Sequence, residues 1–222
     1  MATHPSGESA LVKPVVTGGG HATANRMALN DSSSALSLLE TRRSGRPRDL
    51  IGPGPTDEEL RRILTIASRT PDHGQLVPYR FVIVDAEQRE ALAKLYTDAL
   101  AIAEPDAPEA KVAKAIANAR AAAALVVLIS KPVPNHKIPI FEQEQTCGAA
   151  GMNVLHAATA LGYAAGWITG WPATNPTVSG AFCGEGERIA GFFYVGTSAT
   201  PLEERVRPEL SMVASRWDPP TS

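Results

Sequence analysis

The feature that most constrains the fold is a long helix, predicted over residues 141–161. Gly162 ends it, because glycine readily takes the positive backbone angle that closes a helix. Residues 147–152 in its middle are almost all small, and three alanines continue the pattern: Ala157, Ala158 and Ala160. Small side chains let helices approach closely. We therefore expect a central helix, which packs tightly against other elements or against its own copy in a second chain.

Short apolar runs around this helix predict buried strands. They cover residues 80–85, 125–130 and 188–195, and residues 163–170 read as a strand that opens into a glycine-bearing loop. Helical patterns cover residues 31–42, 56–69, 86–102, 109–120 and 176–182. In the first of these helices, we expect Leu36 and Leu39 to form the buried stripe, with Leu38 as a further candidate. The pattern predicts a mixed fold of helices and strands.

Size and charge narrow the classes of partner. The chain has 222 residues, enough for one substantial core, and its formal charge of −2 gives no reason to expect nucleic acid or an anionic membrane surface. The longest apolar run, residues 121–129, is far shorter than the roughly 20 residues that span a bilayer. We therefore expect neither nucleic acid nor a membrane as a partner.

The cysteines and the N-terminal segment carry little chemistry. Cys147 and Cys183 lack metal-ligand spacing and cannot form a disulfide framework, so no metal site is expected. No secretory signal pattern opens the chain, and a cytoplasmic location is the simplest interpretation. Residues 1–30 are rich in Gly, Ser, Thr, Ala and Pro, which predicts a flexible arm before a single domain of residues 31–222.

Two basic clusters end two successive predicted helices. The first is Arg42-Arg43-Ser44, and the second is a loop that contains Arg69, His73 and Gln75. Arginine offers a planar fork of donors that matches phosphate oxygens, and serine adds another donor. We interpret the clusters as two sides of one site for an anionic ligand. The alternatives are that the arginines complement a helix dipole and that His73 is a solvated surface group.

The chain resembles the FMN-dependent nitroreductase family, most closely its small YdjA-type branch. The likeness covers about residues 35–200 and rests on separated segments in the right order. Besides the two basic clusters, these segments are Pro55-Thr56 with Leu60, His136-Lys137 with Glu142-Gln143-Glu144, Gly162-Tyr163 with Trp167-x-Thr169-Gly170, and Ile189-x-Gly191-Phe192-x-Tyr194-x-Gly196-Thr197. The resemblance implies an α+β three-layer sandwich, in which helices flank a predominantly antiparallel central sheet. It also implies an intertwined homodimer.

The resemblance further implies an FMN site at the subunit interface. Arg42, Arg43 and Ser44 are expected to hold the phosphate and ribityl part, and segment 167–169 is expected to line the isoalloxazine from the other subunit. Ile168 stands where the close branch carries an arginine. The full set of expected cofactor-binding residues is Arg42, Arg43, Ser44, Arg69, His73, Gln75, Trp167, Ile168, Thr169, Gly170 and Arg207.

The implied activity passes hydride from NAD(P)H through flavin N5 to an electron-poor small molecule, such as a nitroaromatic or a quinone. No side chain is then the catalyst, since the flavin carries the chemistry. Three alternatives stay open. They are related flavin chemistry on the same fold (ene reduction, dehalogenation or flavin breakdown), a non-catalytic flavin-binding dimer, and a cofactor-free dimer whose basic clusters cap helices.

Overall fold

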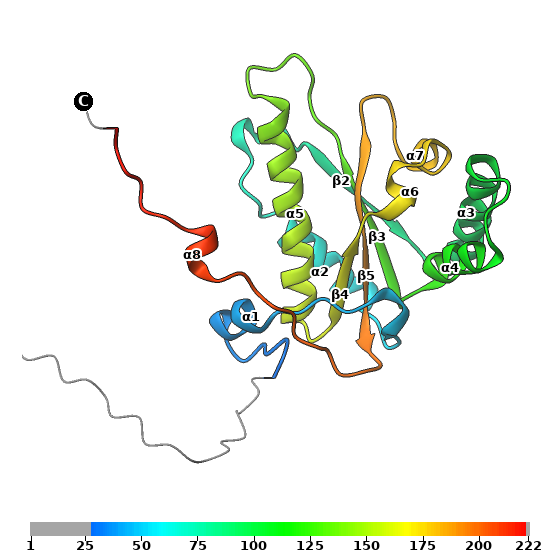
Figure 1. Ribbon diagram of the computed structural model, residues 1–222, viewed down its shortest axis with the longest axis horizontal. Coiled ribbons are helices and arrows are strands. Elements are labelled where there is room, and N and C mark those ends of the chain that lie inside the picture. The colour runs from blue at the N-terminus through cyan, green and yellow to red at the C-terminus, as the bar shows by residue number, and fades with distance from the viewer. Residues whose placement is uncertain (1–27, 221–222) are drawn as a thin grey trace, which may run out of the picture.

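The computed structural model describes residues 28–220 (Figure 1). Most of the predicted N-terminal arm therefore lies outside the described residues. The described chain forms a five-stranded sheet with helices on both faces. Every strand pairing in it is antiparallel, which confirms the predicted α+β sandwich.

The sheet is organised around strand β5 (Arg188–Ser198). On one side β5 pairs with β3 (Ala124–Ser130), which in turn pairs with the edge strand β2 (Tyr79–Val84). β5 also pairs with β4 (Ala164–Ile168), and its last two residues pair with the two-residue β1 (Leu50–Ile51). All of β3 except its first residue is buried, as expected for an apolar strand in the middle of a sheet.

One face of the sheet carries α2 (Asp57–Ala67) and α5 (Ile140–Ala160), the long helix predicted from sequence. α2 begins with a capping box, in which the Thr56 hydroxyl accepts from the Glu59 N–H and the Glu59 carboxylate accepts from the Thr56 N–H. α5 lies close to the sheet, since a Cβ on Gly151 would be only 2.9 Å from the Phe193 ring. The expectation of a central, tightly packed helix is thus confirmed.

The other face carries α3 (Arg89–Ala103), α4 (Glu109–Arg120), α6 (Gly170–Thr174) and α7 (Pro176–Phe182). A 3-10 turn, η3 (Ala86–Gln88), leads into α3. Tyr96 of α3 packs edge-on against Trp171 at 5.6 Å and against Phe192 at 6.3 Å between ring centroids. These aromatic contacts form the centre of a second core, separate from the one beneath α5.

The first helix differs from its prediction. α1 spans Ala35–Thr41, and Ser34 caps it by accepting a hydrogen bond from the Ser37 N–H. Leu38 is buried, whereas Leu36 and Leu39 are 65% and 59% exposed, so the predicted stripe is wrong. Two pairs of residues in α1 have helical spacing: 36 with 39, and 38 with 41. Periodicity alone cannot decide which of these pairs faces α5.

The C-terminal segment returns to the beginning of the described chain. After β5, the Ala199 N–H donates to the carbonyl of Asp49 in the 3-10 turn η1 (Pro47–Asp49). The chain then passes α1 without regular structure and forms the short α8 (Leu210–Val213), as Figure 1 shows in orange and red. The sequence did not predict β1, α6 or α8. The return path brings residues 203–207 to the first basic cluster.

Candidate functional site

The first basic cluster begins where α1 ends. Arg42 is the C-cap of α1, and its backbone leaves the helix at φ −56 and ψ 126. The Gly45 N–H then donates to the Ala165 carbonyl of β4 at 3.0 Å. A Cβ on Gly166 would lie 2.5 Å from the Gly45 carbonyl oxygen, so the close approach requires glycine there. The segment is thereby fixed against β4.

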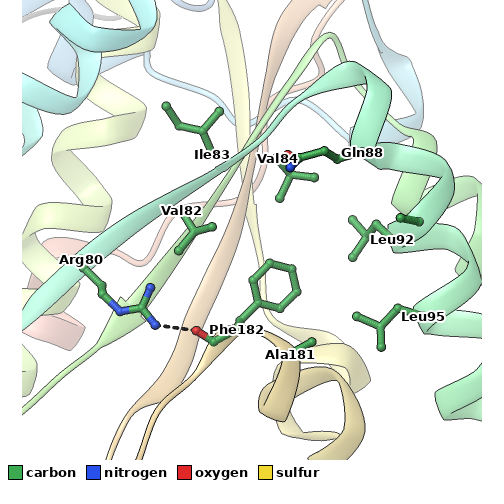
Figure 2. A pocket seen from close by; sticks show the side chains of 10 residues that line it. Arg80, Val82, Ile83, Val84, Gln88, Leu92, Leu95, Ala181 and Phe182 are labelled. Atoms are coloured by element: carbon green, nitrogen blue, oxygen red, sulfur yellow. Dashed lines mark hydrogen bonds between the residues drawn. The ribbon is translucent and has the colours of Figure 1, made fainter.

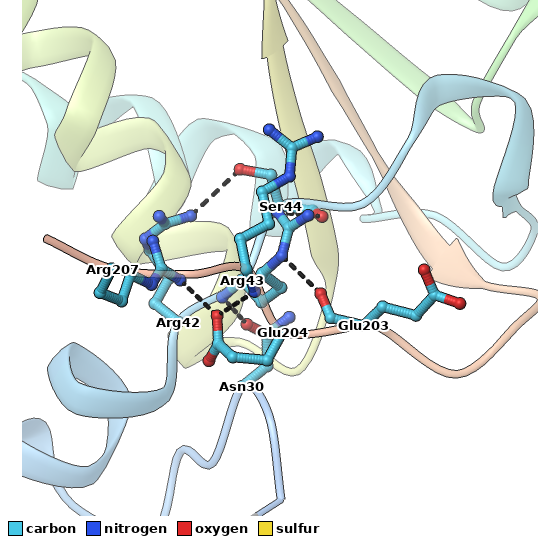
Figure 3. A network of polar contacts seen from close by, with 8 residues as sticks. Asn30, Arg42, Arg43, Ser44, Glu203, Glu204 and Arg207 are labelled. Atoms are coloured by element: carbon cyan, nitrogen blue, oxygen red, sulfur yellow. Dashed lines mark hydrogen bonds and ion pairs between the residues drawn. The ribbon is translucent and has the colours of Figure 1, made fainter.

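Three guanidinium groups gather at this point, from Arg42, Arg43 and, in the returning tail, Arg207 (Figure 3). Burial lowers the pKa of Arg42, and the charges of Arg207 and Arg43 lower it further. The pKa of Arg43 is lowered first by burial and then by Arg205 and Arg207. The cations repel one another and are partly desolvated, so binding of an anion between them is favourable.

Arg42 and Arg43 direct their side chains to different partners. Arg42 donates from Nη1 to the Ser44 hydroxyl at 3.2 Å, and its charge contributes, after burial, to the lowered pKa of His156 on α5. Arg43 donates from Nε to the Glu203 carbonyl at 2.7 Å and from Nη1 to the Ser44 carbonyl at 3.1 Å. Arg42 and Ser44 therefore present donors together, whereas Arg43 chiefly ties the tail to the site.

The tail adds acidic groups, and Asn30 near the start of the described chain adds an anchor; sequence reasoning assigned neither to the site. Glu204 Oε1 accepts from Arg207 Nη2 at 2.9 Å, and a Glu203 carboxylate oxygen lies 3.4 Å from Arg46 Nη2. The Asn30 side-chain carbonyl accepts from the Arg43 N–H at 2.6 Å. These contacts join residues from opposite ends of the chain, and no local pattern signals them.

A polar hollow of about 490 Å³ lies beside the cluster. It is lined by the first basic segment, the end of β5 and the start of the tail, including Arg43, Ser44, Arg46, Ser198, Thr200 and Glu203. Its volume falls within the range of roughly 300–1,000 Å³ that small-molecule sites usually have. Two of the predicted phosphate-binding residues, Arg43 and Ser44, thus border a space of suitable size, whereas Arg42 and Arg207 do not line it.

The second predicted segment lies at the end of β4. The Trp167 indole N–H donates to the Ala190 carbonyl at 3.2 Å, and its ring centroid lies 5.0 Å from that of Phe193, so the side chain is held on the α5 side of the sheet. Ile168 packs into the opposite core. Thr169 and Gly170 are exposed, and Gly170 begins α6 at φ +57. Backbone groups at Thr169 and Gly170 are therefore accessible to a ligand.

The structure groups these segments differently from the resemblance, which implied that segment 167–169 comes from the other subunit. Gly45 and Ala165 are hydrogen-bonded within one chain. The arginine segment and β4 are therefore neighbours in the same protomer, and no second subunit is needed to bring them together.

The loop with Arg69, His73 and Gln75 lies elsewhere. His73 Nδ1 is 2.6 Å from a carboxylate oxygen of Glu142, in the first turn of α5, and all three predicted residues are exposed. An α-helix rises about 1.5 Å per residue, so Glu142 and His156 are roughly 21 Å apart along α5. Because Arg42 lies near His156, one chain does not bring the two basic clusters together. The prediction of a single site between them is wrong for one protomer.

A second cavity, of about 400 Å³, contains none of the predicted site residues (Figure 2). It lies between β2, α3 and α7, and apolar side chains such as Val82, Leu92 and Phe182 line it. The Arg80 guanidinium at its rim is bonded to the Glu187 carboxylate and the Phe182 carbonyl. Its donors are thus engaged with the protein, and the cavity lacks the cation cluster found beside Ser44.

Other chemistries find little support in the described part of the chain. Burial raises the pKa of the Cys147 thiol to about 11, which opposes a nucleophilic role. Residues 28–220 contain no cluster of three or more His, Cys, Asp or Glu side chains suited to a metal ion. Within the same range, no helix combines the length and hydropathy that a bilayer-spanning segment needs.

Comparison with known proteins places the chain in a family. The nitroreductase family model matches residues 39–197. YdjA of Escherichia coli K12, named as an NAD(P)H nitroreductase, is 38% identical over 169 residues, which cover 73% of this chain and 87% of YdjA. A nitroreductase-like family protein of Bacillus cereus has a similar structure, with a TM-score of 0.69 at 20% identity over 83% of this chain and 96% of that chain.

A protein of Exiguobacterium sibiricum, described as a nitroreductase in complex with FMN, gives a TM-score of 0.63 at 15% identity over 83% of this chain and 98% of that chain. The family match includes the arginine segment, the loop that follows α2 and the end of β4. On this match and on the identity to YdjA, the chain belongs to the nitroreductase family.

Proposed function

We propose that the protein is an FMN-dependent oxidoreductase, which takes electrons from NAD(P)H and passes them to an electron-poor small molecule such as a nitroaromatic or a quinone. The observation that carries the proposal is the gathering of Arg42, Arg43 and Arg207 beside the Gly45–Ala165 contact. The name of YdjA supports the NAD(P)H assignment, and the FMN complex of the Exiguobacterium protein supports the flavin.

The residues present fit the phosphate of FMN. Arg42 and the Ser44 hydroxyl present donors side by side, and Arg207 adds a second guanidinium from the tail. Charge-assisted hydrogen bonds from guanidinium to phosphate are roughly twice as strong as neutral ones. Arg42 is partly buried, so a phosphate there would compete with less water than on an open surface.

The end of β4 fits the ring system. Thr169 and Gly170 leave their backbone groups accessible, and Gly166 and Gly45 let the arginine segment lie directly on the strand. Bound FMN would supply N5, which accepts hydride from NAD(P)H and returns it to the acceptor. Arg46, two residues beyond Ser44 and exposed, is the next cation along the segment, and it would stabilise negative charge on the reduced ring.

A homodimer completes the proposal. Leu36 and Leu39 of α1 and Phe141 of α5 are 65%, 59% and 62% exposed. Phe141 lies in the first turn of α5, whereas α1 ends at Arg42 near His156 in the last turns of α5, so large apolar side chains are exposed near both ends of this helix. Exposed apolar surface of this kind is typical of an interaction surface. A second copy that covers α5 would also supply the Arg69–Gln75 loop, which its own chain holds far from Arg42.

The central experiment is the visible spectrum of the purified protein, with FMN titrated into any colourless sample. We expect flavin absorbance, or uptake of added FMN. Anaerobic addition of NAD(P)H should then bleach that absorbance, and a nitroaromatic or a quinone should restore it. A protein that binds FMN but is not reduced would be a non-catalytic binder, and one that takes up no FMN would contradict the proposal.

Arg42→Ala tests the phosphate site directly. Loss of one charge-assisted contact should weaken FMN binding roughly ten- to hundredfold, while the far-UV circular dichroism stays that of the wild type. Arg62→Ala, at an exposed position of α2, is the matched control and should leave FMN affinity unchanged. If Arg42→Ala loses helix and cofactor together, Arg42 serves the end of α1 instead.

A further inference from the structure

The returning tail places a carboxylate among the arginines of the site. Glu204 Oε1 accepts hydrogen bonds from Arg207 Nη2 at 2.9 Å and from the Arg205 N–H at 2.7 Å. The negative charge of Glu204 also opposes the lowering of the pKa of both Arg42 and Arg43. The carboxylate therefore interacts with all three guanidinium groups of the cluster that Figure 3 shows.

Neighbouring contacts hold Glu204 at this place. Arg43 Nε binds the carbonyl of Glu203, the preceding residue, at 2.7 Å, and Arg46 pairs with the Glu203 carboxylate at 3.4 Å. Arg43 is itself anchored, because its N–H donates to the Asn30 side chain at 2.6 Å. The tail thus crosses the basic segment in a defined register, which presents Glu204 to the cluster.

The Glu204 carboxylate is expected to bind the arginine cluster only weakly. The Glu204 and Arg207 side chains are 44% and 54% exposed, and an exposed ion pair contributes only about 0.2–1 kcal/mol. A phosphate monoester carries about −1.5 to −2 charges at neutral pH and offers three acceptor oxygens. The phosphate would therefore displace the Glu204 carboxylate from two or three guanidinium groups. Breaking the Glu204–Arg207 pair costs free energy, so it makes phosphate binding weaker than it would be without Glu204.

We propose that Glu204 is an internal competitor for the ligand phosphate: its carboxylate neutralises the Arg42–Arg43–Arg207 cluster, and a phosphorylated flavin must displace it to bind. Glu204 then sets how strongly the site prefers FMN over riboflavin, which has the same ring without the phosphate. This inference rests on the proposed FMN site.

The test compares Glu204→Gln with Glu209→Gln, which removes the same charge from the same tail at an exposed position outside the cluster. FMN and riboflavin are each titrated, and binding is followed by the change in flavin fluorescence. Glu204→Gln should tighten FMN binding about two- to fivefold, as expected from loss of one exposed competing pair. Riboflavin affinity should not change, and Glu209→Gln should match the wild type for both ligands.

A second variant and a second ligand test the role of Glu204 independently of FMN binding by Glu204→Gln. Glu204→Ala, which leaves no amide to bond Arg207, should tighten FMN binding as well. Inorganic phosphate should raise the melting temperature of both Glu204 variants more than that of the wild type, with sodium chloride at matched ionic strength as control. If no variant binds FMN, the proposed function fails, and the phosphate measurement still decides the role of Glu204.

Two results would overturn the competitor role. Unchanged FMN and phosphate binding in both variants would mean that Glu204 has no influence on the cluster. Weaker binding in both would mean that Glu204 positions Arg207 for the ligand and does not compete with it.

Discussion

Arg42 and Arg43 are neighbours in sequence but have different surroundings. Arg42 shares its side of the segment with the Ser44 hydroxyl, while Arg43 bonds the carbonyls of Ser44 and Glu203. Because the two guanidinium groups have different hydrogen-bond partners, they do not act as one fork. The residue types indicated an anion site here, and the hydrogen bonds of the folded chain decide which arginine is free to bind the ligand.

A second arginine–glutamate contact gives a stability prediction at the residue scale. Arg80 donates to both carboxylate oxygens of Glu187, which also accepts from the Gly184 N–H at 2.8 Å. Arg80 above all, and then the Gly184 N–H, lower the pKa of Glu187 from 4.5 to about 2. A lowered carboxylate pKa stabilises the fold above the unfolded-state pKa, and this stability is lost as the pH falls through the folded-state value.

Glu187→Gln should therefore cost about 1–2 kcal/mol of unfolding free energy at pH 7, a magnitude reduced because Arg80 is partly exposed. The difference from the wild type should shrink as the pH falls from 4.5 toward about 2. Urea unfolding at a series of pH values measures it. Glu185→Gln, in the same turn, should follow the wild type, and a gap that stays constant with pH would contradict the assignment.

At the scale of elements, two glycines of α5 have different surroundings, so their alanine variants measure the effects of packing and of helix propensity separately. A Cβ on Gly151 would come within 2.9 Å of Phe193 and 3.2 Å of Trp167, whereas nothing lies within 4 Å of one on Gly148. Glycine inside a helix costs roughly 1 kcal/mol relative to alanine, and overpacking a core costs about 1–3 kcal/mol.

We therefore expect Gly148→Ala to raise the unfolding free energy by up to about 1 kcal/mol. Gly151→Ala should lower it by about 1–2 kcal/mol, once the propensity gain is offset against the crowded core. Because a Cβ at position 151 would press on Trp167 at the end of β4, this variant should also weaken FMN binding. If Gly148→Ala is destabilising too, the space beside Gly148 is filled by another chain.

Local chemistry made several elements predictable. The helical pattern at 56–69 became α2, which starts at the Thr56–Glu59 capping box, and the apolar run at 125–130 became the buried strand β3. Alternation and capping act between residues close in sequence, so a single sequence contains them. The orientation of α1 was not predictable in this way, because its seven residues fit two faces equally well and only α5 decides between them.

At the scale of the whole molecule, the site depends on contacts between distant segments. The arginine segment was identified from sequence, but the register of Gly45 on Ala165 and the return of Glu203 and Glu204 are set by the complete fold. Arg207 was expected near the phosphate from the family resemblance, and it does lie in the arginine cluster. Its counter-ion Glu204 carried no signal in the sequence.

The assembly prediction follows from the length of α5. A two-fold axis perpendicular to α5 places the N-terminal half of one copy beside the C-terminal half of the other. The partner's Arg69–Gln75 loop, which is anchored near Glu142, would then lie beside the Arg42 end of the first chain. Each flavin site of the dimer would combine Arg42 from one chain with Arg69 from the other.

Mixed dimers test this arrangement. Arg42→Ala and Arg69→Ala homodimers should both bind FMN weakly, because every site carries one lesion. In a mixed dimer of the two variants, isolated with two different tags, one site carries both lesions and the other carries none. We therefore expect half of its sites to bind FMN with wild-type affinity, measured by fluorescence titration. A doubly tagged Arg42→Ala dimer is the control, and absence of a wild-type site in the mixed dimer would place Arg42 and Arg69 in the same chain's pocket.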